Sequence, residues 1–256
     1  MHAFTWLLST LAVTTYAHPT VEQRGGSSND RDSWVPAVRN YFEAVGKEVA
    51  NIKNTPSFPN PPACNLDRCQ MPAAPTPLPP PSAGLKVVHV AIGRGTQNYT
   101  CTDATEASTP VAVGAVAALY NATCTAANYP EILAKAPNAT LQFPTPSGES
   151  DISPAQLVLS GRHFFNGGGT PIFDLVTKRH SYGILFGAKN ASSPAPRYNT
   201  KGQNNKGHGS VPWLKLTQKD GSLGFKEAYR VNTAGGNPPP NCKGIDKTFS
   251  IEYATE

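Results

Sequence analysis

From Gly84 onward, short β-favouring segments alternate with turns that are rich in glycine and proline. Segments of this length and composition are typical of strands rather than helices. The expected strands are residues 85–92, 96–101, 157–159, 162–165, 172–177, 181–188, 213–218, 225–232 and 249–254. Many short strands joined by tight turns predict a mainly β fold, as a single β-sandwich or barrel-like domain of short antiparallel strands.

Two stretches inside this region carry a different pattern. Gly93-Arg94-Gly95 separates two expected strands and indicates a hairpin turn. Residues 110–120 are rich in alanine and valine and predict a helix, and residues 129–136 predict a second, short one. We expect both helices to form a surface excursion from the β domain.

An amphipathic helix is predicted ahead of the β domain. Ser33 can cap its start, and Pro56 prevents its continuation. Its apolar residues recur at spacings of three and four, at Trp34, Val38, Tyr41, Phe42, Val45, Val49 and Ile52. The predicted organisation is a signal peptide over 1–17, a polar segment with this helix over 18–54, a proline-rich linker over 55–82 and the β-rich domain over 83–256. Such a linker favours extended polyproline structure.

The first 17 residues have the features of a secretory signal peptide. The apolar run 3–13 is shorter than the roughly 20 residues that cross a bilayer, and Thr15-Tyr16-Ala17 predicts cleavage before His18. No later run is long enough for a membrane span. The protein is therefore expected outside the cell or in the cell wall. Glycosylation sequons begin at Asn98, Asn121, Asn138 and Asn190, which agrees with secretion.

The chain has five cysteines, and an oxidising compartment favours their pairing with at least one left over. They are Cys64, Cys69, Cys101, Cys124 and Cys242. Spacing does not fix the connectivity. We favour Cys101 with Cys124, which border the predicted excursion, and Cys64 with Cys69 as a small loop. No Cys-x2-Cys spacing supports a zinc site.

Charge and motifs exclude several function classes. The net charge is +5, with basic residues scattered along the chain, so nucleic acid is not an expected partner. Gly93-Arg94-Gly95 lacks the third glycine and the following helix of a dinucleotide site, so no nicotinamide cofactor is expected. Gly-x-Ser-x-Gly and His-Glu-x-x-His motifs are absent from the sequence.

Three residues on neighbouring expected strands are candidates for catalysis. His163, Asp174 and His180 could hold a metal ion or form an acid–base pair if they converged. The alternative is a hydrogen-bonded strand histidine and an exposed turn histidine. His18 at a mature N-terminus could chelate copper, but its flexible, linker-tethered setting offers no rigid support. Whether any cofactor or metal binds is left open.

Aromatic residues near the C-terminus suggest a ligand platform. Trp213 and Tyr229, with Arg230, could stack on and hydrogen-bond a sugar. The alternative is that the two aromatic side chains belong to the core.

Several stretches together resemble a known family. They are Ala83-Gly-Leu-Lys-Val-Val-His-Val-Ala-Ile-Gly-Arg-Gly-Thr-Gln-Asn-Tyr-Thr-Cys101, Ser160-Gly-Arg-His-Phe164, Val211-Pro-Trp-Leu-Lys-Leu216 and Tyr229-Arg-Val-Asn-Thr-Ala-Gly-Gly236 leading to Cys242. The region from about Gly84 to the end resembles a secreted domain-of-unknown-function family of ascomycete fungi and some bacteria. The resemblance implies a fungal origin and no established activity. Its fungal members often carry the label malate dehydrogenase, which the missing dinucleotide motif argues against.

The sequence leaves three functions open. The first is an extracellular glycoprotein that binds cell-wall polysaccharide or host surface components, or has a structural role there. The second is a secreted, metal-assisted enzyme that uses His163, Asp174 and His180. The third is a carrier of a small molecule in the mouth of a barrel.

Overall fold

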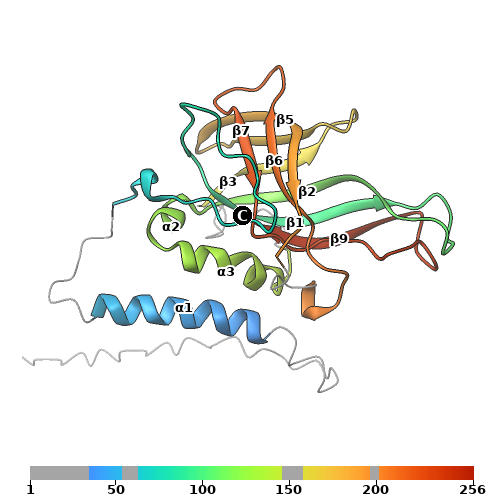
Figure 1. Cartoon of the computed structure of the whole chain (residues 1–256), viewed down its shortest axis with the longest axis horizontal. Helices are drawn as coiled ribbons and strands as arrows, with labels where there is room; N and C mark the ends of the chain where they lie inside the picture. The colour runs from blue at the N-terminus through green and yellow to red at the C-terminus, as the bar shows by residue number, and fades with distance from the viewer. Residues whose placement is uncertain (1–34, 54–62, 146–157, 197–201) are drawn as a thin grey trace, which may run out of the picture.

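The computed structural model describes residues 35–53, 63–145, 158–196 and 202–256. The predicted signal peptide and His18 lie outside these residues. The mainly β prediction is confirmed: nine antiparallel strands form one curled sheet in the order β7-β6-β5-β4-β3-β2-β1-β9-β8 (Figure 1). The strands are β1 Ala91–Thr100, β2 Val111–Asn121, β3 Leu159–Phe165, β4 Pro171–Val176, β5 Ser181–Ser193, β6 Trp213–Gln218, β7 Glu227–Arg230, β8 Ala234–Gly235 and β9 Thr248–Thr255.

The two edges of the sheet meet at one end of the strands. Val231, which follows β7, and Glu256, which follows β9, exchange backbone hydrogen bonds of 2.9 and 3.0 Å. Val211, just before β6, donates its backbone N–H to the carbonyl of Gly235 in β8 at 2.9 Å. These bonds draw the curled sheet into a barrel-like shape with an inner and an outer face.

The predicted turn at residues 93–95 is wrong, because β1 runs through it without interruption. Gly95 faces the neighbouring strand so closely that an added Cβ would lie 1.9 Å from the carbonyl oxygen of Val116. Gly161 in β3 meets the carbonyl oxygen of Asp174 in the same way, at 2.0 Å. Glycine inside a strand marks this kind of tight bend, where a barrel wall curves.

The helix predicted over 110–120 is also wrong, because these residues form most of β2. Alanine and valine suit either structure, and the deciding feature is a period of two. Ala115, Ala117 and Leu119 are buried in alternation along the inner face of β2. The other predicted helix is confirmed as α3 (Pro130–Leu141), which follows the short α2 (Thr123–Asn128).

The N-terminal helix is confirmed as α1 (Val35–Lys53), and it lies alongside α3 (Figure 1). Short 3-10 turns are found at η2 (Leu66–Arg68) and η3 (Gln203–Asn205). No helix in the described part of the chain has the length and hydrophobicity needed to cross a bilayer.

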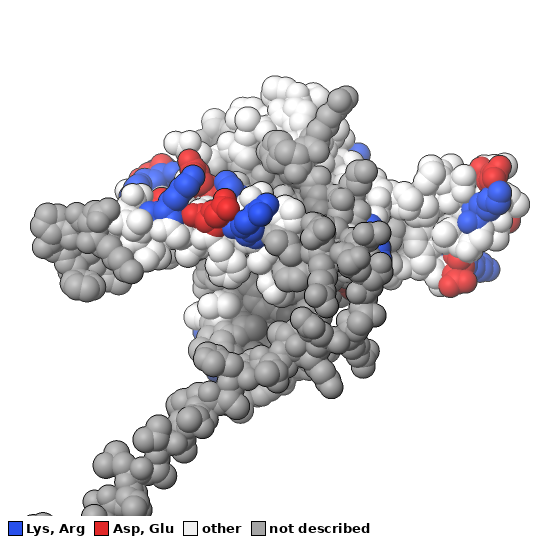
Figure 2. Space-filling view, turned by 90° about the horizontal axis from the view of Figure 1, so that it is seen from below, with Lys and Arg blue, Asp and Glu red and all other residues white. Residues whose placement is uncertain are grey.

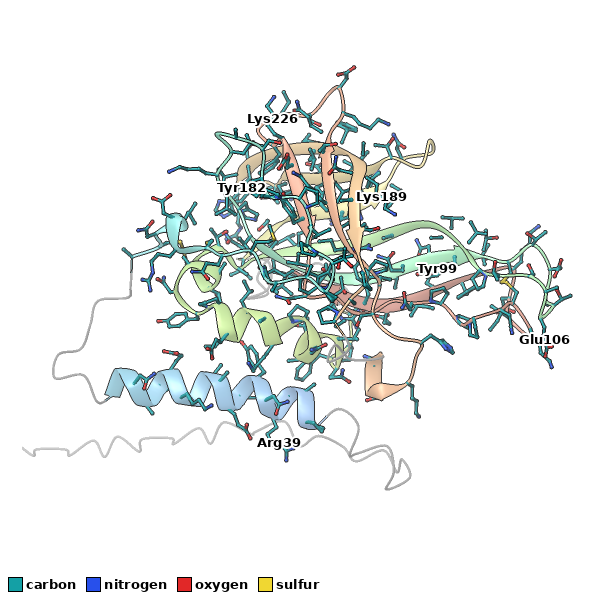
Figure 3. All side chains as sticks on the ribbon, in the orientation of Figure 1. Arg39, Tyr99, Glu106, Tyr182, Lys189 and Lys226 are labelled. Atoms are coloured by element: carbon teal, nitrogen blue, oxygen red, sulfur yellow. A yellow bond between two sulfur atoms is a disulfide. The ribbon has the colours of Figure 1, made fainter. Side chains whose placement is uncertain are left out.

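An arm extends away from the barrel (residues 98–114 and 242–251). It is formed by the end of β1, the start of β2 and the first half of β9. β3 pairs with β2 only from Ala117 onward, so the arm continues without it (Figure 1). A disulfide between Cys101 and Cys242 joins the two segments near the tip, where Glu106 lies (Figure 3). Both predicted pairings are therefore wrong, because Cys124 bonds to Cys64, and Cys69 is free.

The segment before β1 is fastened to the barrel, which an extended spacer would not be. We call residues 63–90 the strap. Cys64 is bonded to Cys124 in α2, and the strap then crosses the outer face of β6 and β7. There the carbonyl of Pro80 accepts a hydrogen bond from Lys215 at 2.7 Å, and that of Pro79 accepts one from Tyr229 at 2.9 Å. Both ends of the strap are thus held.

Replacing Cys64 and Cys124 together by serine should loosen the strap. The bond links residues 60 apart in sequence, so its loss frees a long loop. We expect amide hydrogen exchange over residues 64–90 to rise by on the order of tenfold or more, measured by mass spectrometry. Cys69→Ser, which removes a thiol from the same strap without breaking a disulfide, is the matched control. Equal exchange in the two variants would contradict the role given to the disulfide.

Candidate functional site: a cavity in the barrel

The inner face of the barrel and the strap line a cavity of about 1230 Å³ that is partly open to solvent. Cross-strand partners line it in rows: His163 in β3 faces Phe173 in β4, which faces Leu185 in β5. Leu216 in β6 and Ala228 in β7 form a further lining pair. Alternation along each strand places these side chains inside, because neighbouring residues point to opposite faces. The strap closes one side, with lining residues that run from Leu66 to Val90. The wall is therefore mainly apolar.

Arg230, at the end of β7, is a cationic side chain that lines this cavity. It pairs across the sheet with Leu214, another lining residue, so both point inward. Its Nε and Nη2 atoms donate hydrogen bonds to the carbonyl of Pro212 at 3.1 and 2.8 Å. Burial lowers the pKa of its guanidinium, which nevertheless stays charged at neutral pH.

Two tyrosines lie within the electrostatic reach of Arg230. Burial raises the pKa of Tyr99 to about 12, and Arg230 acts in the opposite direction. Burial also raises the pKa of Tyr253, while Arg230 and the nearby Gln97 amide act to lower it. Both phenols therefore keep their protons at neutral pH. The Tyr99 hydroxyl donates a hydrogen bond to the carbonyl of Gly236 at 2.8 Å.

His163 is held as a neutral ring in the cavity wall. Its side chain is 7% exposed and stacks on Phe173 with ring centroids 4.3 Å apart. Nδ1 lies 2.9 Å from the carbonyl oxygen of Ile172, which requires the proton on Nδ1. Burial lowers the pKa of His163 to about 4; the bond to Ile172 opposes this and Arg230 adds to it.

Comparison with known proteins finds a match that covers most of this site. A family model described as "Protein of unknown function (DUF3455)" matches residues 81–256. The chain belongs to this family. No curated protein and no solved structure matches the chain. The DUF3455 region contains His163, Tyr253, Arg230 and the Cys101–Cys242 disulfide, whereas Cys64 and most of the strap precede it.

The three residues suggested for a metal site in this DUF3455 domain are not brought together. Asp174 follows Phe173, the partner of His163, so its side chain points to the opposite face of the sheet. There it accepts a hydrogen bond from the N–H of Val176 at 3.1 Å. His180 is exposed in the β4–β5 turn, stacked on Tyr182. Within the described ranges, no three His, Cys, Asp or Glu side chains cluster closely enough to hold a metal ion.

The suggested aromatic platform is not formed either. Trp213 is 0% exposed, on the outer face of β6. Tyr229 lies under the strap, with the Lys215 ammonium 5.5 Å from its ring centroid. Tyr229 and Arg230 both border the cavity, but the Tyr229 hydroxyl is taken up by the carbonyl of Pro79 in the strap. The alternative, that the aromatic residues are structural, describes both of them.

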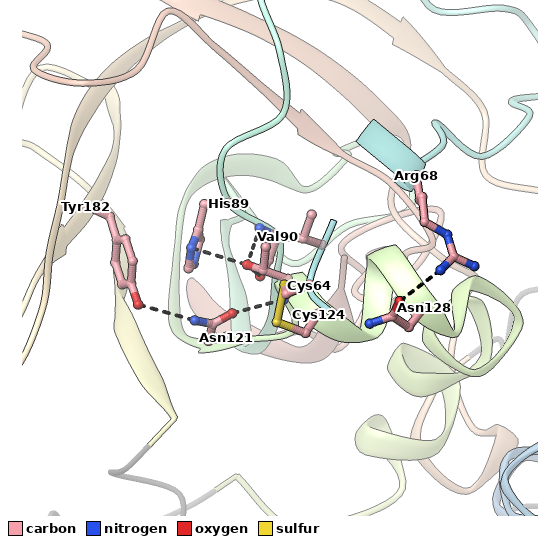
Figure 4. Close-up of a disulfide and its surroundings, with 9 residues drawn as sticks. Cys64, Arg68, His89, Val90, Asn121, Cys124, Asn128 and Tyr182 are labelled. Atoms are coloured by element: carbon pink, nitrogen blue, oxygen red, sulfur yellow. Dashed lines mark hydrogen bonds between the residues drawn. A yellow bond between two sulfur atoms is a disulfide. The ribbon is translucent and has the colours of Figure 1, made fainter. Parts of the chain in front are cut away.

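The sequon asparagines all lie in described residues and none is buried. Asn121 and Asn190 are exposed, whereas Asn98 and Asn138 are half-buried. Asn121 follows its strand beside α2, and its amide contacts the Tyr182 hydroxyl at 3.3 Å (Figure 4). Glycosylation at these positions stays a prediction.

The structure adds a buried ion pair that the sequence analysis did not single out. Lys215 and Glu227 lie 3.1 Å apart under the strap, with their side chains 5% and 8% exposed. The Ser82 hydroxyl donates to Glu227 at 2.6 Å, which fastens the strap to this pair. Desolvation acts to raise the pKa of Glu227, but the hydrogen bonds from Ser82 and Lys215 outweigh it, so the pKa is lowered. The pair is recognisable only once β6 and β7 are paired and the strap covers this face.

A second missed group joins the end of the strap to the barrel. His89 Nε2 lies 2.9 Å from the hydroxyl of Ser160, and its ring lies against Tyr182 at a centroid distance of 4.4 Å. The hydroxyl of Thr123 lies 3.5 Å from Nδ1 of the same ring. Ser160 is fully buried and the group contains no carboxylate, so it lacks the acid and the access that a serine nucleophile needs.

The charged side chains of the outer surface show no single-sign face in the view from below. Figure 2 shows both signs on the α1 side and at the tip of the arm. Arg39 pairs with Glu43 on α1, and Lys243 pairs with Glu106 at the tip. This mixture gives no sign of a binding surface for a polyanion there.

Proposed function

We propose that this chain is an extracellular binding protein whose barrel takes up a small, mainly apolar ligand. The observation that carries the proposal is the cavity of about 1230 Å³, walled by inward-facing side chains such as Phe173, Leu185 and Leu216. Ligand pockets are typically mainly apolar with a few convergent polar groups, and usually measure about 300–1,000 Å³. This cavity has that character and is slightly larger.

Two further features support an extracellular setting. The disulfides Cys64–Cys124 and Cys101–Cys242 are typical of an oxidising compartment. The exposed sequon residues Asn121 and Asn190 would accept glycans without disturbing the core. At the cell surface or host interface, the protein would then capture a molecule released by the wall, the host or the cell itself. The buried Trp213 favours the cavity over a polysaccharide platform.

The proposal predicts saturable binding of an apolar probe inside the barrel. N-phenyl-1-naphthylamine, which is neutral and fluoresces in apolar surroundings, should bind at a single site. Ala228→Trp, which fills the cavity, should weaken binding at least about tenfold. Ala112→Trp, on the exposed arm, is the matched control and should bind as the natural protein does. Circular dichroism checks that both variants fold, and Leu214→Phe offers a milder filling of the cavity. Absence of a saturable site in the natural protein would refute the proposal.

A further inference from the structure

We infer that Arg230 binds the anionic head group of an amphiphile whose single apolar chain lies along the cavity. The inference rests on the proposed function and names the chemical class of the ligand. A carboxylate on an alkyl chain is the simplest member of this class.

The first argument is the charge of Arg230. Two other cations of the barrel, both buried, have carboxylate partners: Lys215 pairs with Glu227 and Arg94 pairs with Glu252. Arg230 contacts only the carbonyl of Pro212, and no carboxylate in the described part of the chain lies within ion-pairing distance of it. A partly buried cation without a counter-charge is costly, and a bound anion removes that cost.

The second argument is the number of donors left unused. A guanidinium has five N–H groups in a planar fork that matches a carboxylate. Two of those on Arg230 are taken by Pro212, which fixes the plane and leaves three. None of its nitrogens is sealed off without a partner, in contrast to Nε of Arg94. The remaining N–H groups are therefore available to a ligand.

The third argument is a further set of donors, Gln97 on β1 and Tyr253 on β9, which lie next to each other. Gln97 is 7% exposed on the inner face of β1, and its Nε2 has no hydrogen-bond acceptor among the described residues. It lies beside Tyr253, whose phenol stays protonated because burial raises its pKa. Arg230 and Tyr253, which both line the cavity, thus offer donors to a ligand there, as an anion site requires.

The fourth argument is the contrast between this end and the rest of the cavity. Away from Arg230, the lining residues include a continuous apolar group, Phe165, Phe173, Leu175, Leu185 and Leu216. A purely ionic ligand would leave this surface without a partner, and a purely apolar one would leave Arg230 without one. An amphiphile satisfies both.

The test compares three ligands with the same chain, namely tetradecanoate, tetradecyl sulfate and tetradecanol, as competitors of bound N-phenyl-1-naphthylamine. In the natural protein the two anions should displace the probe at concentrations at least about tenfold lower than the alcohol. Arg230→Gln should remove this preference while probe binding persists. Arg179→Gln, which removes the same charge from the exposed β4–β5 turn, should retain it.

The outcomes separate this inference from the proposed function. If the probe binds but the anions and the alcohol compete equally in the natural protein, the head-group inference fails and the binding proposal stands. An unchanged preference in Arg230→Gln would also overturn it. If the probe does not bind at all, the binding proposal itself fails. Should Arg230→Gln not fold, Arg230→Lys keeps the charge but loses the fork. Its preference for the two anions over the alcohol should be smaller than that of the natural protein. A preference in Arg230→Lys as large as in the natural protein would count against recognition by the fork.

Discussion

Replacing Gly95 by alanine should lower the free energy of unfolding by at least about 4 kcal/mol, measured by urea denaturation. The added Cβ would lie 1.9 Å from the carbonyl oxygen of Val116 and 2.6 Å from the Cα of Ala117. Both atoms belong to the backbone of β2, so no side-chain rotation relieves the contact. Strands β1 and β2 would have to separate at the place where the barrel wall bends.

Gly167→Ala is the matched control for this prediction. Gly167 lies in the β3–β4 turn, and an added Cβ there meets no atom within 4 Å. Its stability should stay within about 0.5 kcal/mol of the natural protein or rise slightly, because alanine restricts the unfolded chain. Gly161→Ala, whose Cβ would lie 2.0 Å from the carbonyl oxygen of Asp174, should resemble Gly95→Ala. If Gly95→Ala and Gly167→Ala were equally stable, the close approach of the strands would not be a constraint on the fold.

These glycines also show where sequence reasoning stops. Local patterns predicted those strands after β2 in which apolar and polar residues alternate clearly. Among them, β6 was predicted with its observed bounds, Trp213–Gln218. A glycine pair within a β-favouring run has two meanings, a turn or a bend in a barrel strand, and only the neighbouring strand distinguishes them. The alanine-rich β2 failed for a related reason, because small side chains suit both a helix and the crowded inner face of a barrel.

The candidate site was predictable only in part. His163 and Arg230 were singled out from the sequence, but with partners, Asp174 and Tyr229, that strand alternation places on the opposite face. The disulfide between Cys101 and Cys242 joins residues 141 apart, a separation that no local pattern encodes. The docking of the strap depends on Lys215 and Glu227, which become neighbours only after β6 and β7 pair. Long-range pairing, rather than residue type, decided each of these features.

Acidification from pH 7 to about pH 4 should cost the natural protein about 3 kcal/mol of stability through His163 alone. Burial lowers the pKa of His163 from 6.5 to about 4 in the folded state. In the window between these two values the unfolded chain takes up a proton that the folded chain does not. The contribution of the neutral ring is therefore complete above about pH 6.5 and is lost progressively as the pH falls toward 4.

His163→Asn isolates this effect from the other groups that titrate in the same range. The asparagine amide can still donate to the carbonyl of Ile172, which Nδ1 of His163 approaches at 2.9 Å, but it takes up no proton. Urea denaturation at several pH values should show a loss from pH 7 to 4 that is about 3 kcal/mol smaller in this variant. His180→Asn changes a histidine in the exposed β4–β5 turn and should keep the natural slope. Parallel slopes for the natural protein and His163→Asn would mean that the ring is not held neutral in the cavity wall.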